Sequence, residues 1–540
     1  MKTWKHTTAC GILALGTPLL ATAQGAEAPV SRDALFDLEP IKEKTVAPTP
    51  AAAPEMPSSK DALFDLEPVK EKTAAPAPVG TPEIPISKDA LFDLPPPSEG
   101  TTVTTTPVKA ESKEALFGDI PGATVKEEKK SAAWNGFFQG ELARTFADPD
   151  HWSKATGRLE LGKRGRLDNG MQYKISGRVD YNAVYDINDF YASAVRKDQR
   201  AEFHLRENYL DFSSGDWEYR LGRQHIVWGE MIGLFFADVV SAKDMREFIL
   251  QDFQLMRIPQ WAARAEYFKD DYHAELIWIP FPSYDEVGKP FDPATGRYGS
   301  DFYAYPATPL GIAPMVLGET KPASRLSNTN YGLRLSRLTH GWDMSGFLYS
   351  SMSSSPTAYA VDKTTIPGVY QYQLRHDRIH QVGGTLAKDM GGFVLKAEAI
   401  YTGGRRYNVT DAADPDGVVK QNTLDWVLGL DFNPGIDTRL NTQFFQRIYF
   451  DHNPNIIPDR VENGFSLLVN HKFSDALEAE ALVVRSLNRS DWMFRPKLNW
   501  GFQPNWKLTF GLDVFVGPPT GIFGQIDNMD RIYTELRYDF

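Results

Sequence analysis

The chain has 540 residues, a formal net charge of -12 and a mean hydropathy of -0.37. The excess of acidic residues argues against nucleic acid as a partner, and no run of about 18 apolar residues beyond the N-terminus predicts a membrane helix. A membrane β-barrel is not excluded, because its strands are only half apolar, and an aromatic content of 12% is typical of one.

The first 23 residues have the pattern of a secretory signal peptide. Lys2 and Lys5 form a basic start, residues 9–21 form a short apolar core, and residues 21–23 (Ala-Thr-Ala) form a cleavage site. The single cysteine, Cys10, lies inside this signal. We therefore expect the mature chain to use no disulfide, no thiolate metal site and no Cys nucleophile.

Residues 24–133 form a segment of a different composition. They hold 16 of the 37 prolines, and 19 acidic residues against 12 basic ones. Such a segment cannot bury enough apolar surface to offset the conformational entropy that ordering would cost. The composition therefore predicts a disordered tail, which we expect to lie in the periplasm.

A short unit of the type Ser-Lys-Asp-Ala-Leu-Phe recurs four times inside this tail. The copies begin at Ser31, Ser59, Ser87 and, in decayed form, Ser112, and each contains the one aromatic residue of its neighbourhood. One interpretation is a string of docking motifs for a periplasmic or inner-membrane protein, which gain avidity from their shared tether. The other is a duplicated spacer without a partner. Docking is favoured because the sequences between the copies differ, whereas the repeated unit itself stays nearly the same. The docking residues would be Leu35, Phe36, Leu63, Phe64, Leu91, Phe92, Leu116 and Phe117.

From residue 134 to the end, the pattern changes to alternation of apolar and polar residues. In 506–514, for example, Trp506, Leu508 and Phe510 alternate with Lys507 and Thr509. A period of two indicates β-strands. The connections alternate between eight short turns and nine longer loops, which gives about 18 strands. A soluble β-sandwich would not show this asymmetry, so residues 134–540 are predicted to form one antiparallel outer-membrane β-barrel.

The last segment, residues 531–540, reads as the closing strand. Its apolar face ends in Leu536, Tyr538 and Phe540, and an aromatic terminal residue resembles the signal by which the barrel-assembly machinery recognises outer-membrane barrels. We expect this strand to pair with the first one, residues 134–146, and the barrel to face outer-membrane lipid.

The polar faces of the strands would then line the lumen. Their predicted cations are Arg178, Arg220, Arg264, Arg334, Lys396, Arg439, Arg447, Arg495 and Arg537. Charged rings in a pore set ion preference, so these residues could form an anion-attracting strip. Acidic residues are interleaved on nearly every strand, and this favours the alternative of a cross-strand salt-bridge lattice.

Two loops are long enough to enter the lumen. Residues 229–258 contain a helix-like spacing of apolar residues, from Phe235 to Phe253, and residues 281–327 are rich in Pro, Gly, Tyr and Phe. Loops of this length in a compact domain usually have a function. We expect one or both to fold inward as a constriction, while a surface cap is an equal alternative for the second.

One stretch carries a family resemblance. Residues 219–230 (YRLGRQHIVWGE), followed by Asp238 and then by residues 257–259 (Arg-Ile-Pro), resemble a family of large proteobacterial outer-membrane barrels of the domain-of-unknown-function 1302 type. The resemblance extends over about 134–540. That family is similar to alginate-export porins, which implies 18 strands, a charged lumen and passage of hydrophobic compounds or polymers beside an export machinery. The repeat-bearing tail is not a feature of the family.

These observations lead to an outer-membrane channel for a solute, a hydrophobic compound or a polymer, coupled by its repeats to a periplasmic partner. An anchor or adhesin, in which the tail or the surface loops bind a partner protein, remains an alternative. An outer-membrane hydrolase is a minor one, because no Ser or Asp stands in a recognisable motif with a histidine. We expect no catalytic residue, no cofactor and no metal site.

Overall fold

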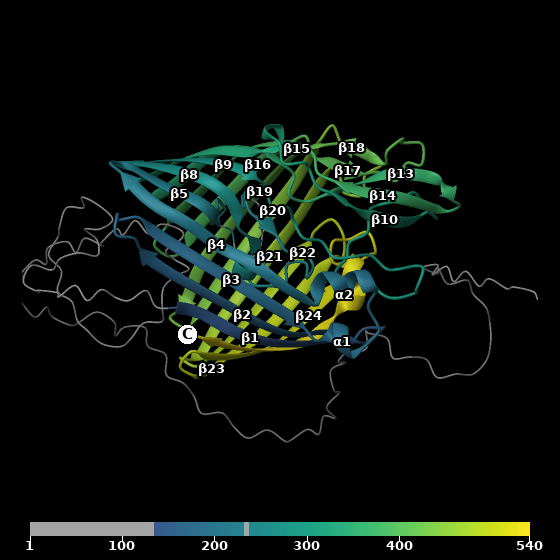
Figure 1. The fold of residues 1–540 in the computed structure, drawn as a ribbon, viewed down its shortest axis with the longest axis horizontal. Coiled ribbons are helices and arrows are strands. Elements are labelled where there is room, and N and C mark those ends of the chain that lie inside the picture. Colours follow the sequence, from purple (N-terminus) through teal and green to yellow (C-terminus); the bar gives the residue numbers. More distant parts are fainter. Residues whose placement is uncertain (1–133, 230, 232–236) are drawn as a thin grey trace, which may run out of the picture. The chain divides into compact units, whose positions relative to one another are not determined.

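The computed structural model describes residues 134–229, 231 and 237–540. The predicted signal peptide, the tail and its docking residues lie outside the described residues. Within them, eighteen strands form one closed antiparallel sheet, in which β25 (Arg531–Asp539) pairs with β1 (Trp134–Thr145) (Figure 1). The 18-stranded barrel and its closure by the last strand are therefore confirmed.

The strands follow one another around the barrel in chain order, and all eight predicted short turns join neighbouring strands at one end. The other barrel strands are β2 (Trp152–Arg166), β3 (Gln172–Asn182), β4 (Ala201–Ser214), β5 (Trp217–Gln224), β8 (Gln260–Lys269), β9 (Tyr272–Phe281), β11 (Asn330–Thr339), β12 (Trp342–Met352), β15 (Arg378–Asp389), β16 (Val394–Gly403), β19 (Asn422–Gly435), β20 (Thr438–Phe450), β21 (Val461–Ser474), β22 (Leu477–Ser486), β23 (Trp492–Gln503) and β24 (Trp506–Val516).

Further short elements lie in the long loops at the opposite end. The strands there are β6 (Ala242–Lys243), β7 (Arg257–Ile258), β10 (Ala313–Thr320), β13 (Thr357–Ile366), β14 (Val369–Arg375), β17 (Arg406–Asn408) and β18 (Val418–Lys420). The helices are α1 (Val184–Ile187), α2 (Ser193–Gln199) and α3 (Phe253–Met256), with 3-10 turns η3 (Leu326–Asn328) and η4 (Gly524–Met529). None of the helices in the described residues is long and apolar enough to cross a membrane.

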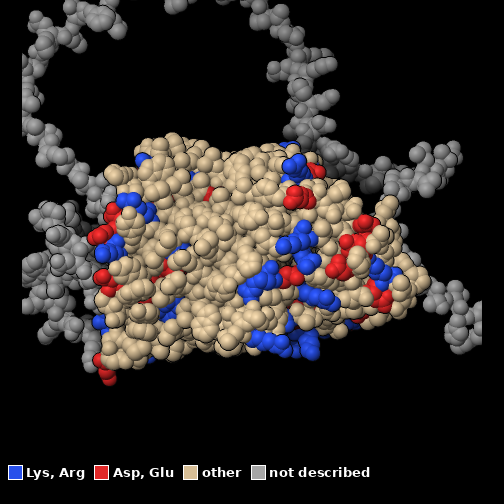
Figure 2. Space-filling model, turned by 90° about the horizontal axis from the view of Figure 1, so that it is seen from above, with Lys and Arg blue, Asp and Glu red and all other residues tan. Residues whose placement is uncertain are grey.

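The barrel is apolar outside and polar inside. On β3, Ile175 and Val179 are 54% and 50% exposed, whereas Arg178 between them is 2% exposed. A broad band of the outer surface has no charged side chain, and Lys, Arg, Asp and Glu gather towards its two ends (Figure 2). Aromatic residues contact one another beside the short turns, for example Trp506 and Tyr538, whose ring centroids lie 4.7 Å apart. An apolar band with flanking aromatics is the surface that lipid requires.

A small sheet at the long-loop end is a feature that the alternation pattern did not predict. β10 pairs in parallel with β14, which in turn pairs with β13, so two different loops share one sheet. The connection between β12 and β15 holds both β13 and β14. The hydrogen-bond partner of β14 comes from a loop about fifty residues earlier in the chain, and local alternation carries no information about such long-range pairing.

Candidate functional site

The structure places all nine predicted lumenal cations on the inward faces of their strands. Eight of them have an acidic neighbour: Arg178 pairs with Asp180, Arg220 with Asp211, Arg264 with Glu266, Lys396 and Arg439 with Asp431, Arg447 with Asp425, Arg495 with Asp513, and Arg537 with Asp539. Arg334 is buried on β11. Such pairing favours the salt-bridge lattice over an uninterrupted strip of free positive charge.

We call the segment between β5 and β8, residues 225–259, the crossing loop; its described residues, 225–229, 231 and 237–259, fold into the lumen. An inward loop was expected here, but the expected helix is wrong. Among its described residues only α3 (Phe253–Met256) is helical, and Phe248 has a φ of 54° that interrupts any longer helix. The apolar residues of the loop recur at helix-like intervals because they contact the barrel wall on opposite sides of the lumen.

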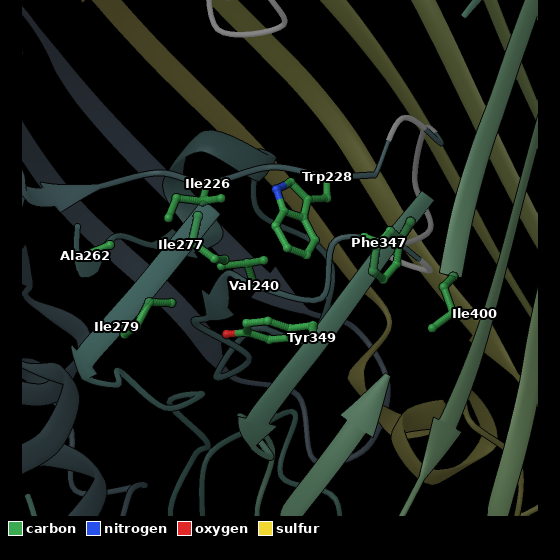
Figure 3. Close-up of a cluster of buried hydrophobic side chains, with 10 residues drawn as sticks. Ile226, Trp228, Val240, Ala262, Ile277, Ile279, Phe347, Tyr349 and Ile400 are labelled. Carbon is green, nitrogen blue, oxygen red and sulfur yellow. The ribbon is translucent and has the colours of Figure 1, made fainter. Parts of the chain in front are cut away.

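One end of the crossing loop is fixed by an aromatic anchor. Trp228 is fully buried, and its ring lies 5.2 Å from that of Phe347 and 5.7 Å from that of Tyr349, both on β12 (Figure 3). Its indole N–H donates to Glu275 Oε2 on β9 at 3.0 Å. The cluster combines burial of a large aromatic surface with a satisfied polar atom, so this end of the loop is rigidly placed.

Glu398 on β16 holds the loop a little further on. Its carboxylate accepts hydrogen bonds from the backbone N–H of Met231 at 3.1 Å and from that of Ala237 at 2.9 Å. Glu398 is only 3% exposed, and a buried carboxylate gains most from such charge-assisted bonds. One wall residue therefore ties two separate positions of the crossing loop to the β12–β16 side of the lumen.

The middle of the crossing loop is held by arginines that belong to the wall. Three of them donate to backbone carbonyls of the loop: Arg495 to Leu250 at 2.8 Å, Arg206 to Arg257 at 2.9 Å, and Arg178 to Leu255 at 3.2 Å. Of these arginines, Arg495 comes from β23, on the side of the barrel away from Trp228, whereas Arg206 and Arg178 come from β4 and β3, which precede β5 around the barrel. Two predicted lumenal cations, Arg178 and Arg495, therefore have a structural role in placing the loop.

Two adjacent loop residues of opposite charge complete the attachment. The Arg246 guanidinium contacts Asp244 at 2.7 Å, Glu202 at 2.8 Å and Glu286 at 3.1 Å. The Glu247 carboxylate contacts Lys154 on β2 at 2.6 Å and Arg531 on β25 at 3.4 Å. The chain turns sharply just after them, so the two side chains reach different parts of the wall.

Burial alone would raise the pKa of Glu247, but the neighbouring Lys154 and Arg531 hold that pKa well below its ordinary value of 4.5. The folded value is thus lower than the unfolded one. The contribution of Glu247 to stability is therefore complete above about pH 4.5 and is lost as the pH falls through the lowered folded value. At neutral pH the residue is an anion.

Two cavities flank this ion-pair cluster. One, of about 60 Å³, extends towards the long-loop end and is lined there by Asn182, Gln199 and Asp301. The other, of about 50 Å³, extends towards the short-turn end and is lined by Lys507 and Glu535. The two share five lining residues, Lys154, Arg158, Glu247, Gln251 and Arg531. The crossing loop therefore narrows the lumen without filling it.

Sequence reasoning missed the residues at this meeting point. Arg531 has the inward parity of Arg537 on the same strand, and that parity could have identified it. Lys154 has the same parity as the buried Arg158 on β2, so the same pattern could have identified it. Glu247 lies in a loop, where no periodicity marks a side chain as pointing to the wall.

The aromatic anchor leads to a stability prediction. Replacing Trp228 by Ala should lower the free energy of unfolding by about 3–5 kcal/mol, because a fully buried ring is removed from a packed cluster. Guanidine titration of the barrel refolded in phospholipid vesicles measures this. The matched control is Trp134→Ala, whose ring is exposed at the start of β1. Equal losses for the two variants would contradict the buried anchor.

Solved structures with a similar course of the chain include proteins of Acinetobacter baumannii and Pseudomonas aeruginosa. OccAB1 of Acinetobacter baumannii is 9% identical with a TM-score of 0.46, and the match covers 76% of this chain and 98% of that one. OccAB4 of the same organism is 12% identical with a TM-score of 0.45, covering 76% and 99%. OccK8 (OprE) of Pseudomonas aeruginosa is 8% identical with a TM-score of 0.44, covering 76% and 98%. Likenesses this distant carry no argument about what this chain transports.

At the level of sequence, no curated protein matches the chain. Residues 150–464 match the family described as "Protein of unknown function (DUF1302)", and this region contains both the crossing loop and the stretch 219–230 on which the resemblance was noted. The similarity to alginate-export porins stays a prediction. The match covers more than half of the sequence, and the chain therefore belongs to the DUF1302 family.

Proposed function

We propose that this protein is an outer-membrane channel for small polar solutes, narrowed by its crossing loop. The observation that carries the proposal is the pair of cavities that meet at five shared residues inside the barrel. An eighteen-stranded barrel is wide enough for an aqueous path unless something fills it. Here the loop leaves space on the side of β1, β2, β23, β24 and β25.

The lining of the two cavities supports a polar solute. The cavity towards the short-turn end has six cationic and four acidic side chains on its wall, and only two aliphatic ones, Leu250 and Leu255. A hydrophobic compound would gain little there and would have to displace water from charged groups. A polymer would need an open bore, but the crossing loop is attached to opposite walls. A small polar solute therefore fits this lumen better than a hydrophobic compound or a polymer.

The orientation of the barrel in the outer membrane follows from the difference between its two ends, one with short turns and the other with long loops. Outer-membrane barrels have short turns in the periplasm and long loops outside the cell. The external loops would then include the β10–β14–β13 sheet, and the tail that precedes β1 would start from the periplasmic side. We thus propose that the barrel lies in the outer membrane with its short turns in the periplasm.

A hydrolytic function has a weaker basis. Thr145, His151 and Asp301 form a chain of contacts, with Thr145 Oγ1 3.0 Å from His151 Nδ1 and His151 Nε2 3.1 Å from Asp301. Thr145 is fully buried and His151 stacks on Phe190 at 4.0 Å, so a substrate could not reach the hydroxyl. These contacts tie three loops together, which is a structural role.

The channel proposal leads to a conductance prediction. Replacing residues 225–259 by a four-residue Gly-Ser linker is sterically simple, because Gln224 and Gln260 are partners across β5 and β8. The single-channel conductance in planar bilayers should rise at least about twofold, since the constriction is removed. A barrel that remains closed both with and without the crossing loop would overturn the channel and favour an anchor or adhesin.

We also propose that the four repeats bind a periplasmic or inner-membrane protein, as the sequence suggests. Replacing Phe36, Phe64, Phe92 and Phe117 by Ala in the full-length protein should abolish capture of that partner, because each repeat would lose its largest apolar side chain. Affinity capture after cross-linking in cells measures this. The control replaces one proline per spacer and should keep the partner. Equal recovery from all variants would exclude docking through these residues.

A further inference from the structure

The Glu247 carboxylate occupies a site that the barrel wall provides. Lys154 Nζ lies 2.6 Å from its Oε1 and 2.8 Å from its Oε2, and Arg531 contacts Oε2 at 3.4 Å. Gln251 adds a side-chain N–H that donates to Oε1 at 2.9 Å. The side chains of Lys154 and Arg531 are only 5% and 4% exposed. A carboxylate thus has an ammonium, a guanidinium and an amide as neighbours in a mostly buried setting.

This site lies where the two cavities meet. Glu247, Lys154 and Arg531 are all among the five residues that line both cavities. A solute that moves from one cavity to the other therefore passes these side chains. No other carboxylate of the crossing loop's described residues lines both cavities.

The wall cations do not depend on Glu247 alone. Arg531 also contacts Asp513 at 2.8 Å, and Lys154 also contacts Glu141 at 2.7 Å. Each cation therefore keeps one wall carboxylate when the loop carboxylate leaves. Glu247, in contrast, reaches the site only through a loop whose other attachments lie elsewhere. Glu247 is therefore the carboxylate that another anion can replace. When it leaves, Lys154 and Arg531 each still have a wall carboxylate as counter-ion.

From this arrangement we propose that Glu247 is a tethered counter-ion in a carboxylate-binding site, and that the channel's solute carries a carboxylate which replaces Glu247 on Lys154 and Arg531. The inference rests on the proposed channel and names the chemical class of its solute. The present occupant of the site is itself a carboxylate, so the spacing of the donors already suits that group. Two cations where the two cavities meet would disfavour a cationic solute.

The test uses the full-length protein in planar bilayers and three four-carbon probes of different charge. Succinate is the dianion, succinamide the neutral analogue and putrescine the dication. In Glu247→Gln, the succinate concentration that halves the KCl current should fall at least about threefold, because the competing carboxylate has been removed from the site. The effects of succinamide and putrescine should not strengthen.

The matched control is Asp431→Asn, which also removes one lumenal carboxylate. Asp431 pairs with Arg439 and Lys396 and lines neither cavity, so its substitution should leave the succinate effect unchanged. Glu247→Asp keeps the charge on a shorter side chain and should give an intermediate shift. Heat-modifiable migration in gels verifies that each variant is folded.

The outcomes separate the two proposals. If wild type and Glu247→Gln both conduct and succinate halves their currents at the same concentration, the counter-ion inference is overturned while the channel stands. The counter-ion inference is also overturned if the succinate concentration that halves the current falls threefold in Asp431→Asn as well. The loss of any lumenal negative charge would then explain the result. If neither wild type nor the loop-shortened barrel conducts, the channel itself fails, and the inference fails with it.

Discussion

The attachment of one loop to opposite walls of the barrel is the constraint on which the lumen depends. On one side of the lumen it rests on a chain of alternating charges that runs from strand to strand and includes one loop residue: Arg495, Asp513, Arg531, Glu247, Lys154 and Glu141. In a mostly buried setting, each charge is costly unless it has a partner. Because Arg531 and Lys154 each keep a wall carboxylate, Asp513 or Glu141, no cation is left without a partner in the exchange of Glu247 for a solute carboxylate that we propose.

The two faces of the barrel wall meet opposite requirements. Outside, residues such as Ile175 and Val179 face lipid and tolerate no charge. Inside, Arg178, which immediately precedes Val179 on the same strand, is buried and donates to the crossing loop. A strand with period-two alternation satisfies both requirements at once, which is why lipid contact and the internal ion pairs can be encoded in the same ten or so residues.

The same alternation explains what could be predicted from the sequence. The inward position of residues such as Arg495 follows from parity, the strand number from the alternation of short turns with longer loops, and the closing pair from the last strand. The role of Arg495 does not, because its partner Leu250 lies 245 residues away. The role of Glu247 could not be predicted from the sequence, because the residues of a loop show no periodic pattern that tells which side chains face the wall. The helix expected over Phe235 to Phe253 was wrong, because apolar residues that contact two opposite walls produce the same spacing as one helical face.

The most direct test of the inward loop is a double-mutant cycle between Glu247 and Lys154, whose charged atoms lie 2.6 Å apart. The free energies of unfolding in vesicles are measured for wild type, Glu247→Gln, Lys154→Gln and the double variant. A loop that lies against the lumenal wall predicts a coupling of at least about 1 kcal/mol. Additivity within about 0.3–0.5 kcal/mol would place the two residues apart and contradict the account.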